Sequence, residues 1–313
     1  MVHASRSSRT RSRLAVLVLV AGLGAVSACS GTSSGAASTM PPAPSSAASA
    51  AVPSAGSGSP LEKLASHRLA PVYWLGERDS TVYLYREYIQ AEDQGDPITT
   101  SLKHMLEQQP GDPDYFNLWS PATRIGTSIN ADNVITVDLS ADAFRRPLDA
   151  GLAERAVQQL VYTATAAAAN AGLLSGSIAP RVVVVVDGHS GYEAFGHVPL
   201  SGPLERDASL RAPIWIIDPQ QDAARTAGRV VITGLSAEFS GGARWEVRRM
   251  ADDGAADVVS TGRLTLGAGQ LPDDQFELAV DLRPGNYEVS VWGQNAGSDE
   301  RLSEDTKHVV VSD

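Results

Sequence analysis

The chain contains a single cysteine, Cys29, among its 313 residues. The rest of the chain therefore has no thiol that could form a disulfide within it or act as a nucleophile. Zinc sites built on cysteine ligands are excluded for the same reason. If the protein works in an oxidising compartment, its fold must be stabilised by burial of side chains without covalent cross-links.

Positive charge is also scarce, with 25 Lys and Arg residues against 36 Asp and Glu residues. Four of the arginines and none of the acids precede Cys29, so a chain cleaved before Cys29 has 21 basic and 36 acidic residues, a net charge of −15. No basic stripe remains, which argues against nucleic acid as a partner. An acidic surface is not attracted to anionic lipids either. Arginine outnumbers lysine 22 to 3 and alanine is abundant, a composition typical of GC-rich genomes such as those of actinobacteria.

The N-terminus has the layout of a secretory signal peptide, predicted to span residues 1–28. Four arginines precede an apolar stretch at residues 14–26, which is shorter than the roughly 20 residues that span a bilayer. Val26-Ser27-Ala28-Cys29 then resembles a bacterial lipobox. Lipidation of Cys29 would attach the protein to the extracytoplasmic face of the cell membrane. The alternative is an ordinary cleaved signal with an incidental cysteine.

Residues 29–60 are expected to be a tether that follows the lipidated cysteine. Residues 30–60 consist of Ser, Ala, Gly, Pro and Thr apart from Met40 and Val52, and they contain no charged or aromatic residue. Such a segment buries too little apolar surface to fold. The remainder is predicted to form two domains, 61–207 and 208–313, because Pro199, Gly202, Pro203 and Pro213 bracket a charged segment.

The first of these domains is predicted to mix helices and strands. Residues 71–75 and 81–85 are typical of a β-hairpin, and Asp96-Pro97 is a favourable start for a helix. A second strand pair is expected at 124–129 and 134–139, followed by a long helix lined by Leu152, Ala156, Leu160 and Ala164. The unbroken valine run at 182–186 predicts a strand that is central or covered on both faces. The element order favours a compact α+β fold.

Three of these segments carry a resemblance to a known family. Residues 134–140 (Val-Ile-Thr-Val-Asp-Leu-Ser), the helix with Gln158 to Thr163 and the strand at 182–188 resemble, in that order, the GerMN domain of bacterial spore-germination proteins. The resemblance covers residues 71–200. It implies an envelope module similar to ring-building domains, with no catalytic centre and no cofactor.

The second domain is predicted to contain only strands, which turn residues separate at the spacing of a β-sandwich. The seven expected strands are residues 214–218, 229–233, 244–248, 258–266, 276–282, 287–292 and 307–311. Trp245 occupies the place of a core tryptophan, and the segment from Arg283 to Tyr287 resembles a tyrosine corner. The domain resembles the immunoglobulin-like domain that accompanies GerMN domains in germination-type proteins, without the disulfide of antibody domains.

Few residues suit catalysis. A serine hydrolase elbow needs Gly-x-Ser-x-Gly, and the three nearest matches, which begin at Gly126, Gly188 and Gly234, lack the final glycine. Asp187, His189 and Ser190 cluster after the valine run and could form a triad. A polar turn with solvent-facing side chains explains them more simply.

Metal-binding patterns are equally weak. His189 and His197 lie eight residues apart, and no HExxH motif is present. Three acidic clusters could supply oxygen ligands to Ca²⁺, but none follows the spaced pattern of a calcium loop, so we expect solvated loops. These clusters are Asp112/Asp114, Asp252/Asp253/Asp257 and Asp273/Asp274.

The sequence therefore favours a lipid-anchored protein of the cell envelope that is not an enzyme and has no cofactor or metal. Its expected partners are the membrane, through the lipid anchor, and envelope proteins or copies of itself. The spore-germination family name suggests a process but does not identify one. Two alternatives stay open: a lipoprotein that binds a small ligand or a cell-wall glycan, and a hydrolase that uses Asp187, His189 and Ser190.

Overall fold

The computed structural model describes residues 69–91, 95–251, 254–269 and 271–313. All of them belong to one compact unit, Val52–Asp313. The predicted signal peptide, Cys29 and the predicted tether lie outside the described residues. No helix in the described ranges is long and apolar enough to cross a membrane.

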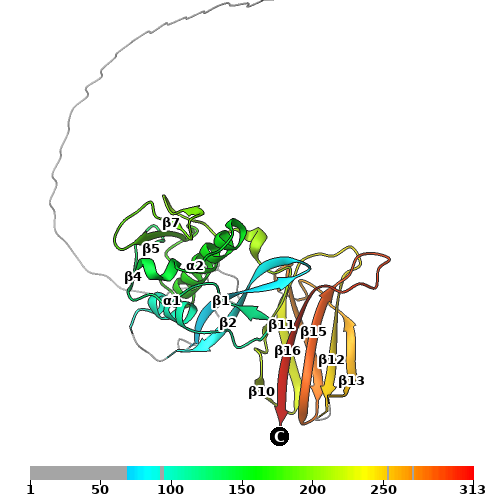
Figure 1. The fold of residues 1–313 in the computed structure, drawn as a ribbon. Helices are drawn as coiled ribbons and strands as arrows, with labels where there is room; N and C mark the ends of the chain where they lie inside the picture. The colour runs from blue at the N-terminus through cyan, green and yellow to red at the C-terminus, as the bar shows by residue number, and fades with distance from the viewer. Residues whose placement is uncertain (1–68, 92–94, 252–253, 270) are drawn as a thin grey trace, which may run out of the picture. The chain divides into compact units, whose positions relative to one another are not determined.

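The N-terminal region combines strands with two α-helices, as the sequence predicts (Figure 1). Its elements, with two short 3-10 helices (η), are β1 (Leu69–Arg78), β2 (Thr81–Gln90), α1 (Pro97–Glu107), β3 (Tyr115–Phe116), β4 (Ile125–Ile129), β5 (Val134–Leu139), η2 (Ala141–Phe144), α2 (Ala150–Asn170), β6 (Arg181–Val186), β7 (Glu193–Ala194), β8 (Val198–Pro199) and η3 (Ala208–Leu210). The strands form the sheets β2-β1-β3 and β4-β5-β6 and the pair β7-β8.

The predicted hairpin and first helix are confirmed. Asp79 and Ser80 both adopt positive φ in a two-residue turn, which is the geometry that matches the twist of the flanking strands. Asp96 caps α1, since its carboxylate accepts hydrogen bonds from the backbone N–H groups of Ile98 and Thr99. Both helices pack against β1 and against each other, and their apolar faces enclose the first core with β5 and β6.

The prediction for the valine strand is only partly right. Residues 181–186 do form strand β6, which pairs in parallel with β5. However, β6 ends the sheet β4-β5-β6, and only Val182, Val184 and Val186 are buried. The intervening Val183 and Val185 are half-buried, so β6 is neither central nor fully covered. β-branched side chains fit a half-buried pleated surface, so a run of them does not report how many faces of the strand are covered.

In the described part of the C-terminal region all elements are strands, and the seven expected ones are confirmed. One has the predicted bounds, 214–218, one lies at 256–263 rather than at 258–266, and the other five are longer than predicted. The seven strands are β9 (Ile214–Asp218), β11 (Gly228–Ser236), β12 (Ala243–Met250), β13 (Ala256–Arg263), β14 (Gln275–Leu282), β15 (Gly285–Gly293) and β16 (Leu302–Ser312). An eighth strand, β10 (Ala223–Thr226), pairs in parallel with β16 and is not predicted from the residue pattern.

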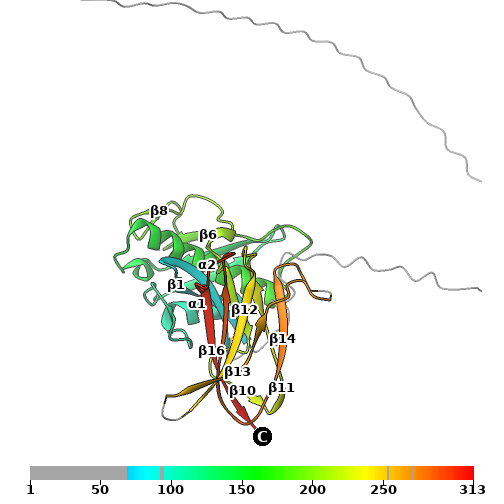
Figure 2. The same cartoon turned by 90° about the vertical axis from the view of Figure 1, so that its right-hand side faces the viewer.

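Two sheets build this region, with strand orders β10-β16-β15-β12-β13 and β14-β11-β9 (Figure 2). Both contribute to the second hydrophobic core, where Ile232 and Phe276 from one sheet join Val247 and Val289 from the other. Trp215 and Ile217 on β9 belong instead to the first core, so β9 contributes to both cores.

Candidate functional site

Asp187, His189 and Ser190 follow β6 in an exposed turn and do not form a triad. The carboxylate of Asp187 contacts the Arg124 guanidinium at 3.4 Å and accepts a hydrogen bond from the backbone N–H of Ala141. His189 Nδ1 lies 2.8 Å from the carbonyl oxygen of Asp187 rather than from its carboxylate. Among the described contacts, none links His189 to Ser190. This arrangement cannot activate a serine, because a base must reach the nucleophile and be oriented by a third group.

Several of the candidate metal ligands are engaged in protein contacts. Nε2 of His197 lies 2.9 Å from the carbonyl oxygen of Leu148, while His189 contacts its own turn. The carboxylate of Asp274 pairs with Arg211 at 3.0 Å. Asp252 and Asp253 lie outside the described residues. Within the described ranges, no three His, Cys, Asp or Glu side chains gather as a metal site would require.

Trp245 and Tyr287, the two residues assigned to the core of the second domain, lie on neighbouring strands. The Trp245 indole is half-buried and packs over Gly262, where an added Cβ would come within 2.8 Å of it. Tyr287 is buried, and its hydroxyl donates a 2.8 Å hydrogen bond to the carbonyl oxygen of Arg283.

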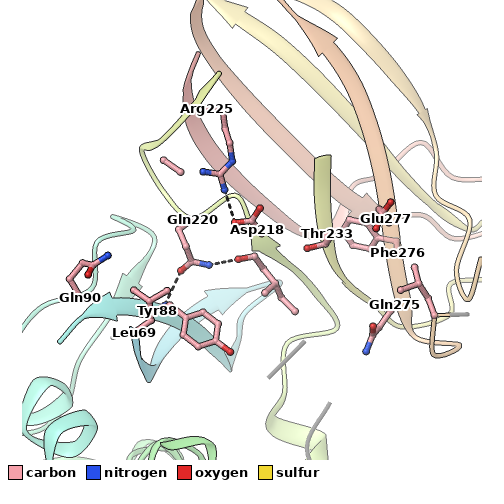
Figure 3. Close-up of a pocket in the computed structure, with 13 residues that line it drawn as sticks. Leu69, Tyr88, Gln90, Asp218, Gln220, Arg225, Thr233, Gln275, Phe276 and Glu277 are labelled. Carbon is pink, nitrogen blue, oxygen red and sulfur yellow. Dashed lines mark hydrogen bonds and ion pairs between the residues drawn. The ribbon is translucent and has the colours of Figure 1, made fainter. Parts of the chain in front are cut away.

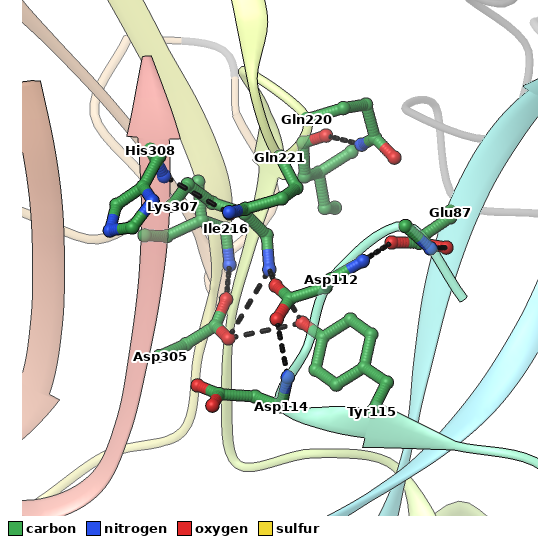
Figure 4. A network of polar contacts seen from close by, with 12 residues as sticks. Glu87, Asp112, Asp114, Tyr115, Ile216, Gln220, Gln221, Asp305, Lys307 and His308 are labelled. Carbon is green, nitrogen blue, oxygen red and sulfur yellow. Dashed lines mark hydrogen bonds and ion pairs between the residues drawn. The ribbon is translucent and has the colours of Figure 1, made fainter. Parts of the chain in front are cut away.

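The most unusual chemistry lies where the N-terminal region meets β16. Lys307 and Asp112 form an ion pair in which each side chain is only 2 % exposed. The Lys307 ammonium also donates a 2.7 Å hydrogen bond to the hydroxyl of Tyr115 and lies 3.5 Å from Asp305 (Figure 4). The expectation of a solvated loop at Asp112 is therefore wrong, because this carboxylate is buried against a cation.

The loop that presents Asp112 is shaped by carboxylates. Glu87 on β2 accepts hydrogen bonds from the backbone N–H groups of Gly111 and Asp112 at 3.0 and 2.8 Å. The carboxylate of Asp112 accepts another from the backbone N–H of Asp114, whose own side chain pairs with Arg78 at 2.7 Å. The carboxylates of Asp112 and Asp114 therefore accept hydrogen bonds from protein donors, which leaves them poorly suited to bind Ca²⁺.

Asp305 connects the network to β9. One of its carboxylate oxygens accepts a 2.7 Å hydrogen bond from the backbone N–H of Ile216, and the other accepts one from the Tyr115 hydroxyl at 3.0 Å. Complete burial raises the pKa of Asp305, although Lys307 and the Ile216 N–H act in the opposite direction. Burial also raises the pKa of the Tyr115 hydroxyl well above its usual value, with a further contribution from Asp305.

The tip of the β1–β2 hairpin adds two more contacts with β16. Nε of Arg78 donates to the carbonyl oxygen of Glu304 at 2.6 Å, and the carboxylate of Asp79 accepts from the backbone N–H of Ser303 at 2.7 Å. The rings of Tyr85 and Tyr115 stack 4.6 Å apart beside Gly76, where any side chain would collide with both. This junction attaches the N-terminal region to the C-terminal strands through buried polar groups.

Strand β13 is the most accessible edge of the larger C-terminal sheet. It ends the strand order, so within the described ranges no strand pairs with its outer side. A bulge leaves Val259 without a partner in β12, and the side chains of Val258 and Val259 are 53 % and 47 % exposed. Successive exposed valines on an unpaired edge are typical of surfaces that contact another chain.

Comparison with known proteins identifies the N-terminal region. Residues 71–190 match the family described as Germane, sporulation and spore germination. The chain contains a Germane domain. The match agrees with the GerMN resemblance read from the sequence, and the matched residues contain α1, α2, the strands β2 to β6 and most of β1. This family is linked to sporulation and germination rather than to a known enzymatic reaction.

Solved structures give weaker likenesses. The first GerMN domain of the sporulation protein GerM from Bacillus subtilis is 16 % identical, with 44 % of this chain and 97 % of that chain covered and a TM-score of 0.34. The tandem GerMN domains of GerM from Bacillus subtilis are 16 % identical, with 46 % of this chain and 47 % of that chain covered and a TM-score of 0.33. CopC from Methylosinus trichosporium OB3b is 15 % identical, with 32 % of this chain and 93 % of that chain covered and a TM-score of 0.24. These TM-scores are too low to support an argument. No curated protein matches the chain.

The residues that make the junction were missed by the sequence analysis, although one signal was available. Lys307, Val309 and Val311 alternate along a predicted strand in which Val309 and Val311 face the core, and Asp305 continues the same phase. A lysine in phase with buried valines indicates a buried charge that needs a partner.

Proposed function

We propose that this protein is a non-enzymatic lipoprotein of the bacterial cell envelope that acts by binding other proteins, first of all a second copy of itself. Cys29 carries the lipid anchor, and residues 30–60 hold the folded part off the membrane. The C-terminal region is assigned to the immunoglobulin-like class, which the hydrogen bond from Tyr287 to Arg283 and the two facing sheets support.

The observation that carries the proposal is the outer edge of β13, which no strand in the described ranges covers, in a chain whose residues 71–190 match the Germane family. If β13 pairs antiparallel with its copy about Ser260, Asp257 of one chain lies opposite Arg263 of the other. Such a contact is two-fold symmetric, so the same ion pair forms twice. The exposed side chains of Val258 and Val259 would be buried by the same contact.

The buried junction at Lys307 supports this role in a second way. It fixes the Germane domain against the C-terminal strands, so an assembly through β13 would hold the Germane domains in a defined arrangement. A binding protein with two rigidly joined modules loses less conformational entropy when a partner engages both.

The test is crosslinking of the tagged, anchored protein in cells, followed by capture and identification of the crosslinked species. Val259→Lys places a charge at the edge and should abolish the crosslinked dimer. Val310→Lys is the matched control, because Val310 is 43 % exposed on β16, which is not at the edge of its sheet. An unchanged dimer in Val259→Lys would refute self-association through β13.

Anchoring is tested separately with Cys29→Ala. The variant should be released to the medium, because the acyl chains are the only membrane attachment that we propose. If it stays in the membrane fraction, the lipidation proposal is wrong.

A further inference from the structure

A cavity of about 580 Å³ lies between the β1–β2 hairpin and the C-terminal strands (Figure 3). Leu69 and Tyr88 line it on the hairpin side, and Thr233 and Phe276 line it on the side of the smaller C-terminal sheet. Its volume falls within the range of about 300–1,000 Å³ that is usual for small-molecule sites, which occur preferentially at such junctions. The site is distinct from the Lys307 network and from the β13 edge.

The walls of the cavity are mostly apolar. Ile217, Ala223, Leu271 and Phe276 join Leu69 in the lining, and both Phe276 and Ile217 are buried. These side chains offer no hydrogen bonds, so the cavity favours the apolar body of a ligand.

Polar side chains also line the cavity. The side-chain amide of Gln220 accepts a 3.1 Å hydrogen bond from the backbone N–H of Tyr88 and donates to the carbonyl oxygen of Ile217. It therefore occupies the place of a peptide group between two strand edges, a contact that a ligand amide or hydroxyl could share. Gln90 adds a second amide at the exposed end of β2.

The charges of the described lining residues sum to −1. The Asp218 carboxylate pairs with the Arg225 guanidinium at 2.6 Å, so these two groups largely cancel. Glu277 is exposed, and no unpaired cation remains among the described lining residues to balance its charge. A negatively charged ligand would be repelled by Glu277, and Arg225, the one cation among the described lining residues, is already paired.

We propose that this cavity binds a small amphiphilic molecule with an apolar body and a neutral or cationic polar group. This site would give the protein a ligand in addition to its protein partners, and it does not depend on the assembly proposed above. The apolar body fills the space against Phe276 and Leu69, and the polar group lies near the amides of Gln90 and Gln220.

Two fluorescent probes with the same anilinonaphthalene body test the proposal on the full-length Cys29→Ala chain, which avoids partition of the probe into lipid. The neutral probe is N-phenyl-1-naphthylamine, and 8-anilinonaphthalene-1-sulfonate adds a negative charge. We expect saturable binding of one neutral probe per chain and at least tenfold weaker binding of the sulfonate. Equal binding of both, or binding without saturation, would overturn the assigned chemistry.

Ala223→Trp fills the cavity, and Ala224→Trp is the matched control, because Ala224 is the exposed neighbour on β10 that does not line it. The first variant should weaken binding of the neutral probe at least tenfold, and the second should leave it unchanged. If Ala223→Trp does not fold, Ala223→Leu takes its place with a smaller expected loss. Equal binding by the filled and control variants would place the probe elsewhere and refute the site.

Glu277→Gln tests the charge argument. Removing this carboxylate should strengthen the binding of the sulfonate and so narrow the difference in affinity between the two probes. An unchanged ratio of the two affinities would mean that the preference for the neutral probe does not come from the lining of this cavity.

Discussion

Lys307 and Asp112 lie 195 positions apart in the chain and form an ion pair that is almost completely buried. One residue comes from β16 and the other from the loop after α1, so the contact joins the N-terminal region to the last strand of the C-terminal region. Tyr115 and Asp305 complete the network. A buried ion pair contributes little net stability by itself, but removal of one partner leaves the other charge unpaired in an apolar environment.

Lys307→Met should therefore reduce the free energy of unfolding by about 3 kcal/mol, within the usual range for breaking a buried ion pair. Urea unfolding followed by tryptophan fluorescence measures the change. Lys103→Met, which removes an exposed lysine on α1, is the control and should have little effect. If the two variants are equally stable, the Lys307 network is not stabilising the junction.

A compensated variant sharpens this test. Combining Lys307→Met with Asp112→Asn and Asp305→Asn removes the unpaired charges together with the cation. It should recover part of the stability lost by Lys307→Met alone, because the cost of the single change comes from the buried carboxylates. A triple variant that is less stable than the single one would contradict this explanation.

Asp96→Ala should destabilise the protein by about 1 kcal/mol through loss of the cap on α1. The carboxylate of Asp96 accepts hydrogen bonds from Ile98 N–H and Thr99 N–H and from the hydroxyls of Thr99 and Thr127. Asp96→Asn keeps a capping oxygen and should lose less stability than Asp96→Ala. Thermal unfolding followed by circular dichroism separates the variants, and equal melting temperatures for Asp96→Ala and the original protein would count against the cap.

Gly234→Ala should lower the free energy of unfolding by about 1–3 kcal/mol or more, because the added methyl group overpacks the core. A Cβ at this position would lie 2.3 Å from the carbonyl oxygen of Trp215 and 2.4 Å from the ring of Phe276. Gly202→Ala is the matched control, because no atom lies within 4 Å of its added Cβ. Chemical denaturation of both variants gives the comparison, and a loss at Gly202 as large as at Gly234 would contradict the steric account.

Asp142 should contribute to the loss of stability in acid. Hydrogen bonds from the hydroxyls of Ser140 and Thr123 lower its pKa to about 2. The unfolded chain, with an ordinary aspartate pKa near 4, then binds more protons than the folded chain between about pH 2 and pH 4. Stability from this group is complete above that window and is lost as the pH falls through it.

Asp142→Asn should therefore flatten the pH dependence of the unfolding midpoint between about pH 2 and pH 4 and leave the slope above pH 5 unchanged. Urea titrations at several pH values measure both slopes. A variant whose acid-limb slope matches that of the original protein would show that Asp142 does not titrate as described.

Much of the fold could be predicted from residue patterns because those patterns are local. Asp96-Pro97 places the start of α1 correctly, and apolar spacing along 150–170 gives α2. The missed strand β10 has four residues, Ala-Ala-Arg-Thr, with no apolar alternation, and it forms only through its pairing with β16. The position of β6 at the edge of its sheet is also a tertiary property, which its valines do not encode.

The candidate sites were less predictable for the same reason. Asp112 looks like a solvated loop residue until a cation from the far end of the chain is placed beside it. The cavity depends on Leu69, Ala223 and Phe276, which come from three separated segments. Only Lys307 could be recognised from the local sequence, because its alternation with Val309 and Val311 indicates a buried charge.

The measurement that tests the central claim most directly is in-cell crosslinking of the anchored protein, with Val259→Lys compared with Val310→Lys. The account predicts a crosslinked dimer that is lost in Val259→Lys and retained in Val310→Lys. A dimer that persists in Val259→Lys, or the absence of any dimer in the original protein, would contradict assembly through β13.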